Sequence, residues 1–385
     1  MRYAFNRIVI DPNKPVKQSG HLQQVNPISK VNDHLHARVF ALEDDEKIFI
    51  NISCDVLGFL YNYTTEILEN IKDSFDKPVH LILSATHTHY SGDTTNTAYH
   101  DQLVAQLTQA IKELKFTTAD LTYTYRKIPY QEVGTSRITN HQALVILNLV
   151  EIFDKDKLIA NIINYNCHPT ILSADETDFF SAEYVGYFLE KLTEKEDCFS
   201  TFLQGAAGDV STRFTRSGQH YQNVIELATK LYEKVLELKQ NKATHYSLDN
   251  FTIKEKVIET KCSFEDIDLS NLPTNLSARE LETIEFGKIV RSKLKEHPEK
   301  LQKEMILTRL TLGKLKIIFA PNELFSYYLS LVNDNNTILV CYSNGYSPYV
   351  TPINKTLLTY ETFTDVLTKE TKQQLVDTLI EFSQG

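Results

Sequence analysis

The sequence predicts an α/β fold in which a mixed β-sheet core is flanked by helices and carries a helical insertion. The chain passes repeatedly from a short apolar, β-branched run through a turn into a helical pattern, and this alternation is typical of α/β architecture. Its 385 residues are 42% hydrophobic and 23% charged, which is the composition of a globular protein with a packed core. The absence of a fixed-period repeat argues against solenoids and propellers.

Eight apolar runs bounded by polar or turn residues are expected to form strands, at residues 37–42, 47–53, 79–85, 143–153, 159–165, 199–203, 314–320 and 337–342. Apolar residues at helical spacing predict helices that cover the sheet, at residues 63–73, 100–114, 182–192 and 222–238. Residues 263–305 change character, because a polar turn is followed by a charged helical pattern. We therefore expect residues 1–385 to form one domain with an inserted helical arm near 263–305.

Net charge and composition exclude some classes of binding partner and indicate where in the cell the protein is located. A formal net charge of -10 argues against nucleic acid or an anionic membrane as the main partner. The N-terminal sequence MRYAFNRIVIDPNKP lacks a basic-then-apolar signal, and no run of about 18 apolar residues occurs, so we expect a cytoplasmic protein without a transmembrane segment. The five cysteines form no CxxC pair, which indicates reduced thiols. The oligomeric state is not predicted.

The sharpest local signal is SATHTHYSGD, which begins at Ser84, within the apolar run 79–85. In an extended segment, His87 and His89 would project to the same side. Both imidazoles could bind one metal ion, or one could bind it while the other handles protons or substrate. A pair of capped surface histidines is the structural alternative.

A second histidine follows another predicted strand. In NYNCHPT, His168 lies where the strand 159–165 gives way to a turn held by Pro169. A neutral imidazole at a strand end is well placed to bind metal. A hydrogen-bonded structural histidine is the alternative.

Three further segments follow predicted strands. The small-residue loop QGAAGDVS, residues 204–211, permits tight turns and close approach of a substrate, but it has neither the P-loop nor the GxSxG pattern. In PNE, Glu323 is either an anionic metal ligand or a cap of a helix at 324–332. The tyrosine-rich loop 342–352 continues to Tyr360, and most such tyrosines are packing residues.

In this order, THTHYSG, NxxxHP, GxxGDVS, PxE and NxYxxYVT resemble the motif series of the neutral/alkaline, non-lysosomal ceramidases. Weaker matches are DHLHAR at 33–38, and residues 11–20, where Gly20 corresponds to the glycine of the family's opening turn. The resemblance covers about residue 8 to about residue 365, and the arm is its least matched portion.

The resemblance implies a zinc-dependent amidohydrolase of lipid and sphingolipid metabolism, acting on the linear amide of ceramide or another N-acyl or lipid-like small molecule through a zinc-activated water. It implies the four Zn²⁺ ligands His87, His168, Glu323 and Tyr349. It further implies that His89, Arg137 and Tyr360 bind substrate and act in catalysis, and that Gly20 contributes to substrate binding. Ser211 lies in the GDVS motif near the site; it is either a nucleophile or, as we prefer, a positioning residue.

The sequence departs from the family pattern where the substrate would lie. The family's Asn-Arg-Arg is Thr135-Ser136-Arg137 here, and its GDVSPN is GDVSTR, so the residues that shape the substrate pocket differ. Two other functions stay open. One is a metal-dependent esterase or phosphohydrolase, in which Asp55 would help to hold a second metal ion. The other is an inactive homologue that binds a ligand.

Overall fold

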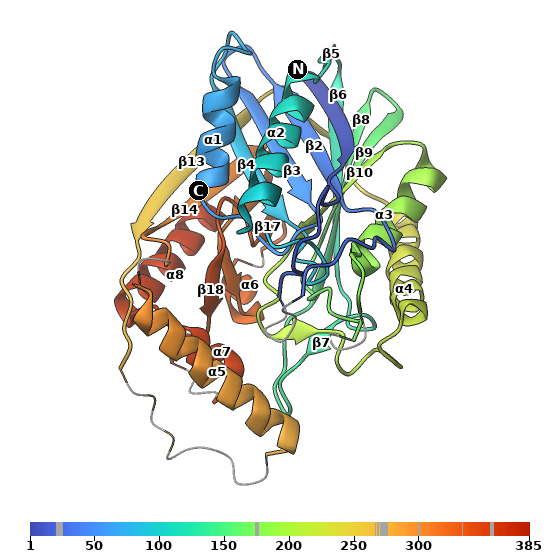
Figure 1. Ribbon diagram of the computed structural model, residues 1–385. Coiled ribbons are helices and arrows are strands. Elements are labelled where there is room, and N and C mark those ends of the chain that lie inside the picture. Colours follow the sequence, from blue (N-terminus) through green and yellow to red (C-terminus); the bar gives the residue numbers. More distant parts are fainter. Residues whose placement is uncertain are drawn as a thin grey trace.

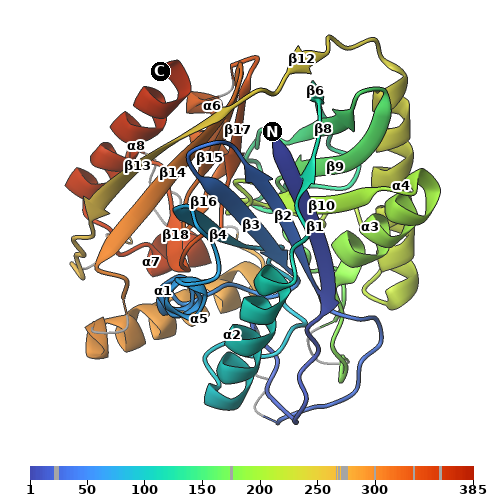
Figure 2. The same cartoon turned by 90° about the horizontal axis from the view of Figure 1, so that it is seen from above.

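The α/β prediction is confirmed. The computed structural model describes residues 1–385 except 21–25, 174–176, 266, 268, 270–275, 299–300, 333 and 355–357. Three large β-sheets lie side by side in the middle of the molecule, and helices cover their outer sides (Figures 1 and 2).

The first sheet has the strand order β4-β3-β2-β1-β5. Its strands are β1 (Arg2–Val9), β2 (His36–Glu43), β3 (Ile48–Cys54), β4 (Val79–Ala85) and β5 (Thr117–Thr118). Helices α1 (Asn62–Ile71) and α2 (Thr97–Lys112) pack against it. Helix α2 begins three residues before the predicted start, because the Asn96 side chain accepts hydrogen bonds from the first free amides of the helix.

The second sheet has the order β10-β9-β8-β6-β12. Its strands are β6 (Leu121–Pro129), β8 (Ile146–Asp154), β9 (Lys157–Tyr165), β10 (Phe199–Gln204) and β12 (Tyr246–Ser247). Helices α3 (Glu183–Glu196) and α4 (Tyr221–Gln240) pack against each other and against this sheet. Figure 1 shows both helices on the side of the molecule opposite α8.

The third sheet has the order β13-β14-β15-β17. Its strands are β13 (Phe251–Glu259), β14 (Glu304–Leu312), β15 (Leu315–Phe319) and β17 (Thr337–Val340), and helix α8 (Lys369–Gln384) packs against β13 and β15. Two small sheets pair β7 (Thr135–Ser136) with β11 (Val210–Ser211) and β16 (Asn322–Leu324) with β18 (Ser347–Val350). The remaining helices are α5 (Ala278–Glu296), α6 (Ser326–Leu331) and α7 (Tyr360–Thr364).

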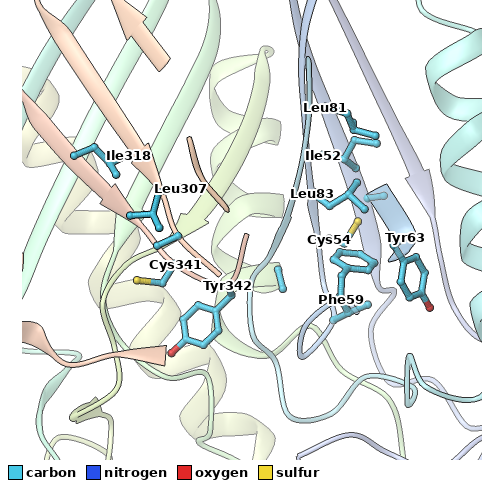
Figure 3. Close-up of a cluster of buried hydrophobic side chains, with 14 of the residues drawn as sticks. Ile52, Cys54, Phe59, Tyr63, Leu81, Leu83, Leu307, Ile318, Cys341 and Tyr342 are labelled. Atoms are coloured by element: carbon cyan, nitrogen blue, oxygen red, sulfur yellow. The ribbon is translucent and has the colours of Figure 1, made fainter. Parts of the chain in front are cut away.

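The predicted strands are rich in apolar residues because both faces of the large sheets are covered. One buried cluster contains side chains from all three sheets, including Phe49, Ile162 and Ile317, so their inner faces share a core. Another buried cluster joins the first and third sheets, and Figure 3 shows Leu83 and Ile318 among its members.

Each large sheet contains one pair of parallel strands, and the carboxyl ends of these pairs converge. The pairs are β3 with β4, β9 with β10, and β15 with β17. Hydrogen bonds join their ends: the Ala85 amide donates to the Tyr342 carbonyl at 3.0 Å, and the Cys341 amide donates to the Gln204 carbonyl at 2.8 Å. Ligands of α/β proteins bind at the carboxyl ends of strands, so this junction is where a site is expected.

The predicted arm is partly found. Helix α5 occupies residues Ala278–Glu296, begins with a capping box between Ser277 and Glu280, and packs against α7. Residues 304–305, which we assigned to the arm, belong to β14, and positions 266, 268, 270–275 and 299–300 of the arm lie outside the described residues. That the chain is a single domain stays a prediction.

Within the described residues, no helix combines the length and the apolar character that a membrane span requires.

Candidate metal centre

His87 is held by a left-handed backbone conformation just after β4. Its φ angle is 68°, so the extended segment that we predicted for 87–89 is wrong, although the two imidazoles still lie close together. The His87 Nδ1–H donates to the Leu57 carbonyl at 2.7 Å. The ring stacks on Tyr342 with a centroid separation of 4.0 Å, and the side chain is fully buried. These contacts fix which ring nitrogen faces the junction.

His168 reaches the same point from the end of β9. Its Nδ1–H donates to the Ala207 carbonyl at 2.7 Å, and its amide donates to the Val210 carbonyl at 3.1 Å. The small-residue loop 204–211 therefore orients this imidazole. The ring centroids of His87 and His168 are 4.8 Å apart, so the two predicted ligands are brought together.

Glu323 lies between the two imidazoles. It belongs to strand β16, and the following helix begins only at Ser326, so the alternative that Glu323 caps a helix at 324–332 is wrong. Its Oε2 is 3.3 Å from His87 Nε2 and 3.1 Å from His168 Nε2. The Tyr346 hydroxyl donates a hydrogen bond to the other carboxylate oxygen, Oε1.

These three atoms fit a cation. Because both Nδ1 protons are already donated to backbone carbonyls, each neutral imidazole presents an Nε2 lone pair, and the carboxylate oxygen is also an electron-pair donor. His87 Nε2 is buried and makes no hydrogen bond. A ligating histidine that donates its other N–H to a backbone carbonyl is the usual arrangement at metal sites. The donor set of two imidazoles and one carboxylate suits Zn²⁺.

The fourth predicted ligand, Tyr349, lies beside the other three. Strand β18 pairs with β16 so that Tyr349 is opposite Glu323, and the Tyr349 hydroxyl is 3.4 Å from His168 Nε2. The Arg137 guanidinium lies 5.1 Å from the centroid of the Tyr349 ring, and its Nη2 is 2.6 Å from Glu361 Oε1. The phenol oxygen therefore completes a four-residue cluster, with a guanidinium next to it.

His89 is close to the centre but has a different position. Its ring centroid is 5.1 Å from that of His87 and 5.8 Å from that of His168, and the potential ligand atoms of the three histidines lie within 4.8 Å of one another. Gly20, with φ of 80°, packs so tightly on His89 that an added Cβ would lie 2.5 Å from Nδ1. The geometry thus permits His89 to be a ligand or a substrate-binding residue.

Burial and neighbouring charges set the protonation of the cluster. Burial, together with the nearby Arg137 charge, lowers the pKa of His168 to about 4, so this imidazole is neutral at pH 7. Burial alone would raise the pKa of Glu323, but His87 and His168 lower it well below its ordinary value. Burial raises the pKa of the Tyr349 phenol, and the Arg137 charge opposes this. An anionic Glu323 carboxylate beside the neutral imidazole of His168 is a combination that can bind a metal cation.

A cavity of about 430 Å³ adjoins the cluster. Arg137, Ser211 and Tyr360 are among the residues that line it, so three of the predicted catalytic residues face one space. Ser211 is next to His168 through a β-bridge. Its Oγ accepts a hydrogen bond from the Arg213 amide at 3.3 Å, which is a contact of a turn and not of a nucleophile with its base.

The Asp55 carboxylate forms a buried ion pair with Arg38. Its Oδ2 accepts hydrogen bonds from the His36 amide and from Arg38 Nη1, both at 2.9 Å, and its Oδ1 accepts one from Thr86 at 3.2 Å. The Asp55 and Arg38 side chains are buried together. The geometry therefore argues against the second metal ion on which the phosphohydrolase alternative depends.

The motifs did not assign roles to the residues that support the ligands. The sequence places Tyr342 and Tyr346 in a tyrosine-rich loop without indicating a role for either. No sequence pattern indicates that the Leu57 carbonyl would accept a hydrogen bond from His87. Glu361, the partner of Arg137, directly follows Tyr360 and was not singled out. The position of Tyr346, three residues before the candidate ligand Tyr349, was the one sequence feature that could have indicated a role for Tyr346 near the metal centre.

No family model and no curated protein sequence matches the chain. Among solved structures, the crystal structure of neutral ceramidase from Pseudomonas aeruginosa matches with a TM-score of 0.76 and 14% sequence identity, over 99% of this chain and 74% of that chain. This chain has a neutral ceramidase-like fold. A structure described as ceramidase complexed with C2 matches with a TM-score of 0.73 and 14% identity, again over 99% of this chain and 74% of the other. At this identity the ceramidase-like fold is what the likeness establishes, and the chemistry rests on the side chains.

Proposed function

We propose that this protein is a zinc-dependent hydrolase that cleaves the amide bond of ceramide or a related N-acyl small molecule. The observation that carries the proposal is the convergence of His87 Nε2, His168 Nε2 and Glu323 Oε2, with both Nδ1 protons donated elsewhere. The neutral ceramidase-like fold supports the same chemistry. His87, His168, Glu323 and Tyr349 would hold the ion.

Zinc bound there would supply an activated water molecule and polarise the substrate carbonyl. Hydrolysis adds the water oxygen to the acyl carbon, breaks the carbon–nitrogen bond and leaves a proton on the released amine. Arg137 and Tyr360 line the cavity next to the cluster, where their N–H and O–H groups can donate to the carbonyl oxygen as negative charge develops on it. His89, packed against Gly20, would orient the substrate or transfer the proton.

The test is metal analysis of protein purified without added zinc, combined with a panel of N-acyl substrates before and after chelation. We expect one zinc ion per chain, amide hydrolysis that the chelator removes, and recovery on adding Zn²⁺. Turnover that survives removal of the metal would indicate Ser211 instead. Two metal ions per chain with hydrolysis of phosphate esters would favour the phosphohydrolase, and zinc binding without turnover of any compound would indicate the inactive homologue.

Tyr346→Phe tests whether the hydrogen bond to Glu323 Oε1 matters for metal binding. The hydroxyl leaves only Oε2 directed at the imidazoles, so its loss frees the carboxylate to rotate. Loss of such a supporting contact typically weakens metal binding by about tenfold to a hundredfold. Competition with a zinc-binding dye measures this affinity without turnover, and Tyr327→Phe, at an exposed tyrosine of α6, is the matched control. Equal zinc affinity in both variants would contradict the role.

A further inference from the structure

Glu361 is a carboxylate at the cavity that contacts a candidate catalytic residue. It follows Tyr360 in helix α7, lines the cavity and is buried. Its Oε1 lies 2.6 Å from Arg137 Nη2. A buried ion pair costs desolvation energy and is weak evidence for added stability. The pair is therefore better explained by what it does for the site.

The backbone of Arg137 is fixed, but its side chain needs a partner to hold one orientation. The Arg137 amide donates to the Asp209 carbonyl at 2.8 Å, and the preceding residue, Ser136, pairs with strand β11. An arginine side chain has several rotatable bonds, so a fixed backbone does not fix the guanidinium. The Tyr349 ring, whose centroid is 5.1 Å away, and the Glu361 carboxylate supply the missing contacts.

A second carboxylate competes for the same guanidinium. Burial would lower the pKa of Arg137, but the carboxylates of Glu361 and, to a smaller extent, Glu323 raise it. Glu323 is a candidate metal ligand, and a guanidinium paired with it would occupy the oxygens that a metal cation needs. The ion pair with Glu361 therefore keeps the Arg137 charge near the centre without blocking this ligand.

Helix α7, which carries Glu361, is held closely against α5 (Figure 1). A Cβ atom added to Gly287 of α5 would lie 2.8 Å from Phe363 Cβ and 3.0 Å from the Tyr360 carbonyl oxygen, so the two helices are in close contact. The Glu361 carbonyl accepts a hydrogen bond from the Asp365 amide at 2.9 Å. A residue that orients another side chain must itself be fixed, and these contacts fix the backbone of Glu361.

We propose that Glu361 is a positioning residue of the amide hydrolysis, which holds the Arg137 guanidinium at the cavity and away from Glu323. This inference rests on the proposed hydrolase function and adds a residue to its site. Glu361 forms no bond to the substrate and transfers no proton; it fixes the direction of the Arg137 N–H groups. Arg137 Nε is buried and makes no hydrogen bond to the described residues, so this donor is available to the carbonyl oxygen on which negative charge develops.

The test is a double-mutant cycle of E361Q and R137Q, measured on zinc-loaded protein with an N-acyl substrate that the wild type hydrolyses. We expect E361Q to lower kcat by about tenfold to a hundredfold, as loss of a supporting contact does, and to leave KM within about twofold of the wild-type value. In R137Q/E361Q the second substitution should change kcat no further, because Glu361 acts only through Arg137. Additive losses, or an unchanged kcat in E361Q, would overturn the proposal.

Two further variants separate positioning from folding. Glu151 is a buried carboxylate that pairs with Arg126 and Lys239 and does not line the cavity. E151Q should therefore lower the melting temperature without changing kcat. E361D keeps the charge and shortens the side chain by one methylene, so its kcat should lie between those of the wild type and E361Q. If E361Q does not fold, E361D takes its place in the cycle with the same expected pattern.

The zinc affinities of the same four proteins keep the two proposals apart. If the wild type hydrolyses no amide, the hydrolase proposal fails, and competition with a zinc-binding dye decides the role of Glu361. E361Q should bind zinc about tenfold or more weakly than the wild type, because the released guanidinium can pair with Glu323. In the R137Q background the same substitution should leave zinc affinity unchanged. A loss of affinity in both backgrounds, or in neither, would overturn the role.

Discussion

His87→Ala is expected to remove both zinc binding and hydrolysis. The imidazole is buried, is fixed by the Leu57 carbonyl and the Tyr342 ring, and directs Nε2 at Glu323 Oε2. Alanine removes one of four predicted ligands and leaves the carboxylate with a single imidazole partner. We expect zinc affinity to fall by more than the about hundredfold that loss of a supporting contact costs, and kcat to fall to background.

Two matched histidine variants make this result specific. His80→Ala lies in the same strand, β4, away from the junction, and should keep full zinc content. His89→Ala should keep zinc but lose turnover, because we assign His89 to the substrate. If His89→Ala loses zinc while His87→Ala retains it, the ligand assignment is wrong. In that case His89, and not His87, binds the ion from the cluster of three histidines.

Tyr360→Phe should lower kcat by about a hundredfold or more while zinc content stays at one ion per chain, as expected for a donor lost from an oxyanion site. Tyr360 lines the cavity, and its ring centroid is 5.8 Å from that of the ligand candidate Tyr349. Burial and the charges of Glu323 and Glu361 raise the pKa of the Tyr360 phenol, so it remains a protonated hydrogen-bond donor at neutral and moderately alkaline pH.

The controls for Tyr360 distinguish chemistry from packing. Tyr327→Phe removes an exposed hydroxyl of α6 and should leave kcat unchanged. Tyr360→Phe should retain the wild-type melting temperature, because only one oxygen is lost from the half-buried ring. An unchanged kcat in Tyr360→Phe would transfer the oxyanion role to Arg137 alone.

The strands that carry the site could be predicted because they are buried on both faces. Strand β4 was predicted with the same bounds, residues 79–85, that the structure has, since a strand of a sheet covered on both sides is rich in apolar residues. Strand β13, at the sheet edge, was missed because three consecutive charged residues, Lys254 to Lys256, interrupt its apolar pattern. Both lysines pair with Glu381 of α8. That pairing joins residues far apart in sequence, so no local pattern indicates it.

The identities of the candidate ligands could be nominated from motifs, but the contacts that orient them could not. The positive φ angle of His87 shows that residues 87–89 are not the extended segment that we predicted. The Ala207 carbonyl that binds His168 Nδ1 lies 39 residues further along the chain, and the support of Glu323 by Tyr346 requires β16 and β18 to be neighbours. Such contacts arise from the convergence of three sheets, which a single sequence does not encode locally.

The most direct test of the central claim is anomalous X-ray scattering from crystals of the zinc-loaded protein, measured on both sides of the zinc absorption edge. We expect one peak, bonded to His87 Nε2, His168 Nε2, a Glu323 oxygen and the Tyr349 oxygen at distances of about 2.0–2.2 Å. A zinc peak elsewhere, or none at this cluster in protein that hydrolyses amides, would contradict it.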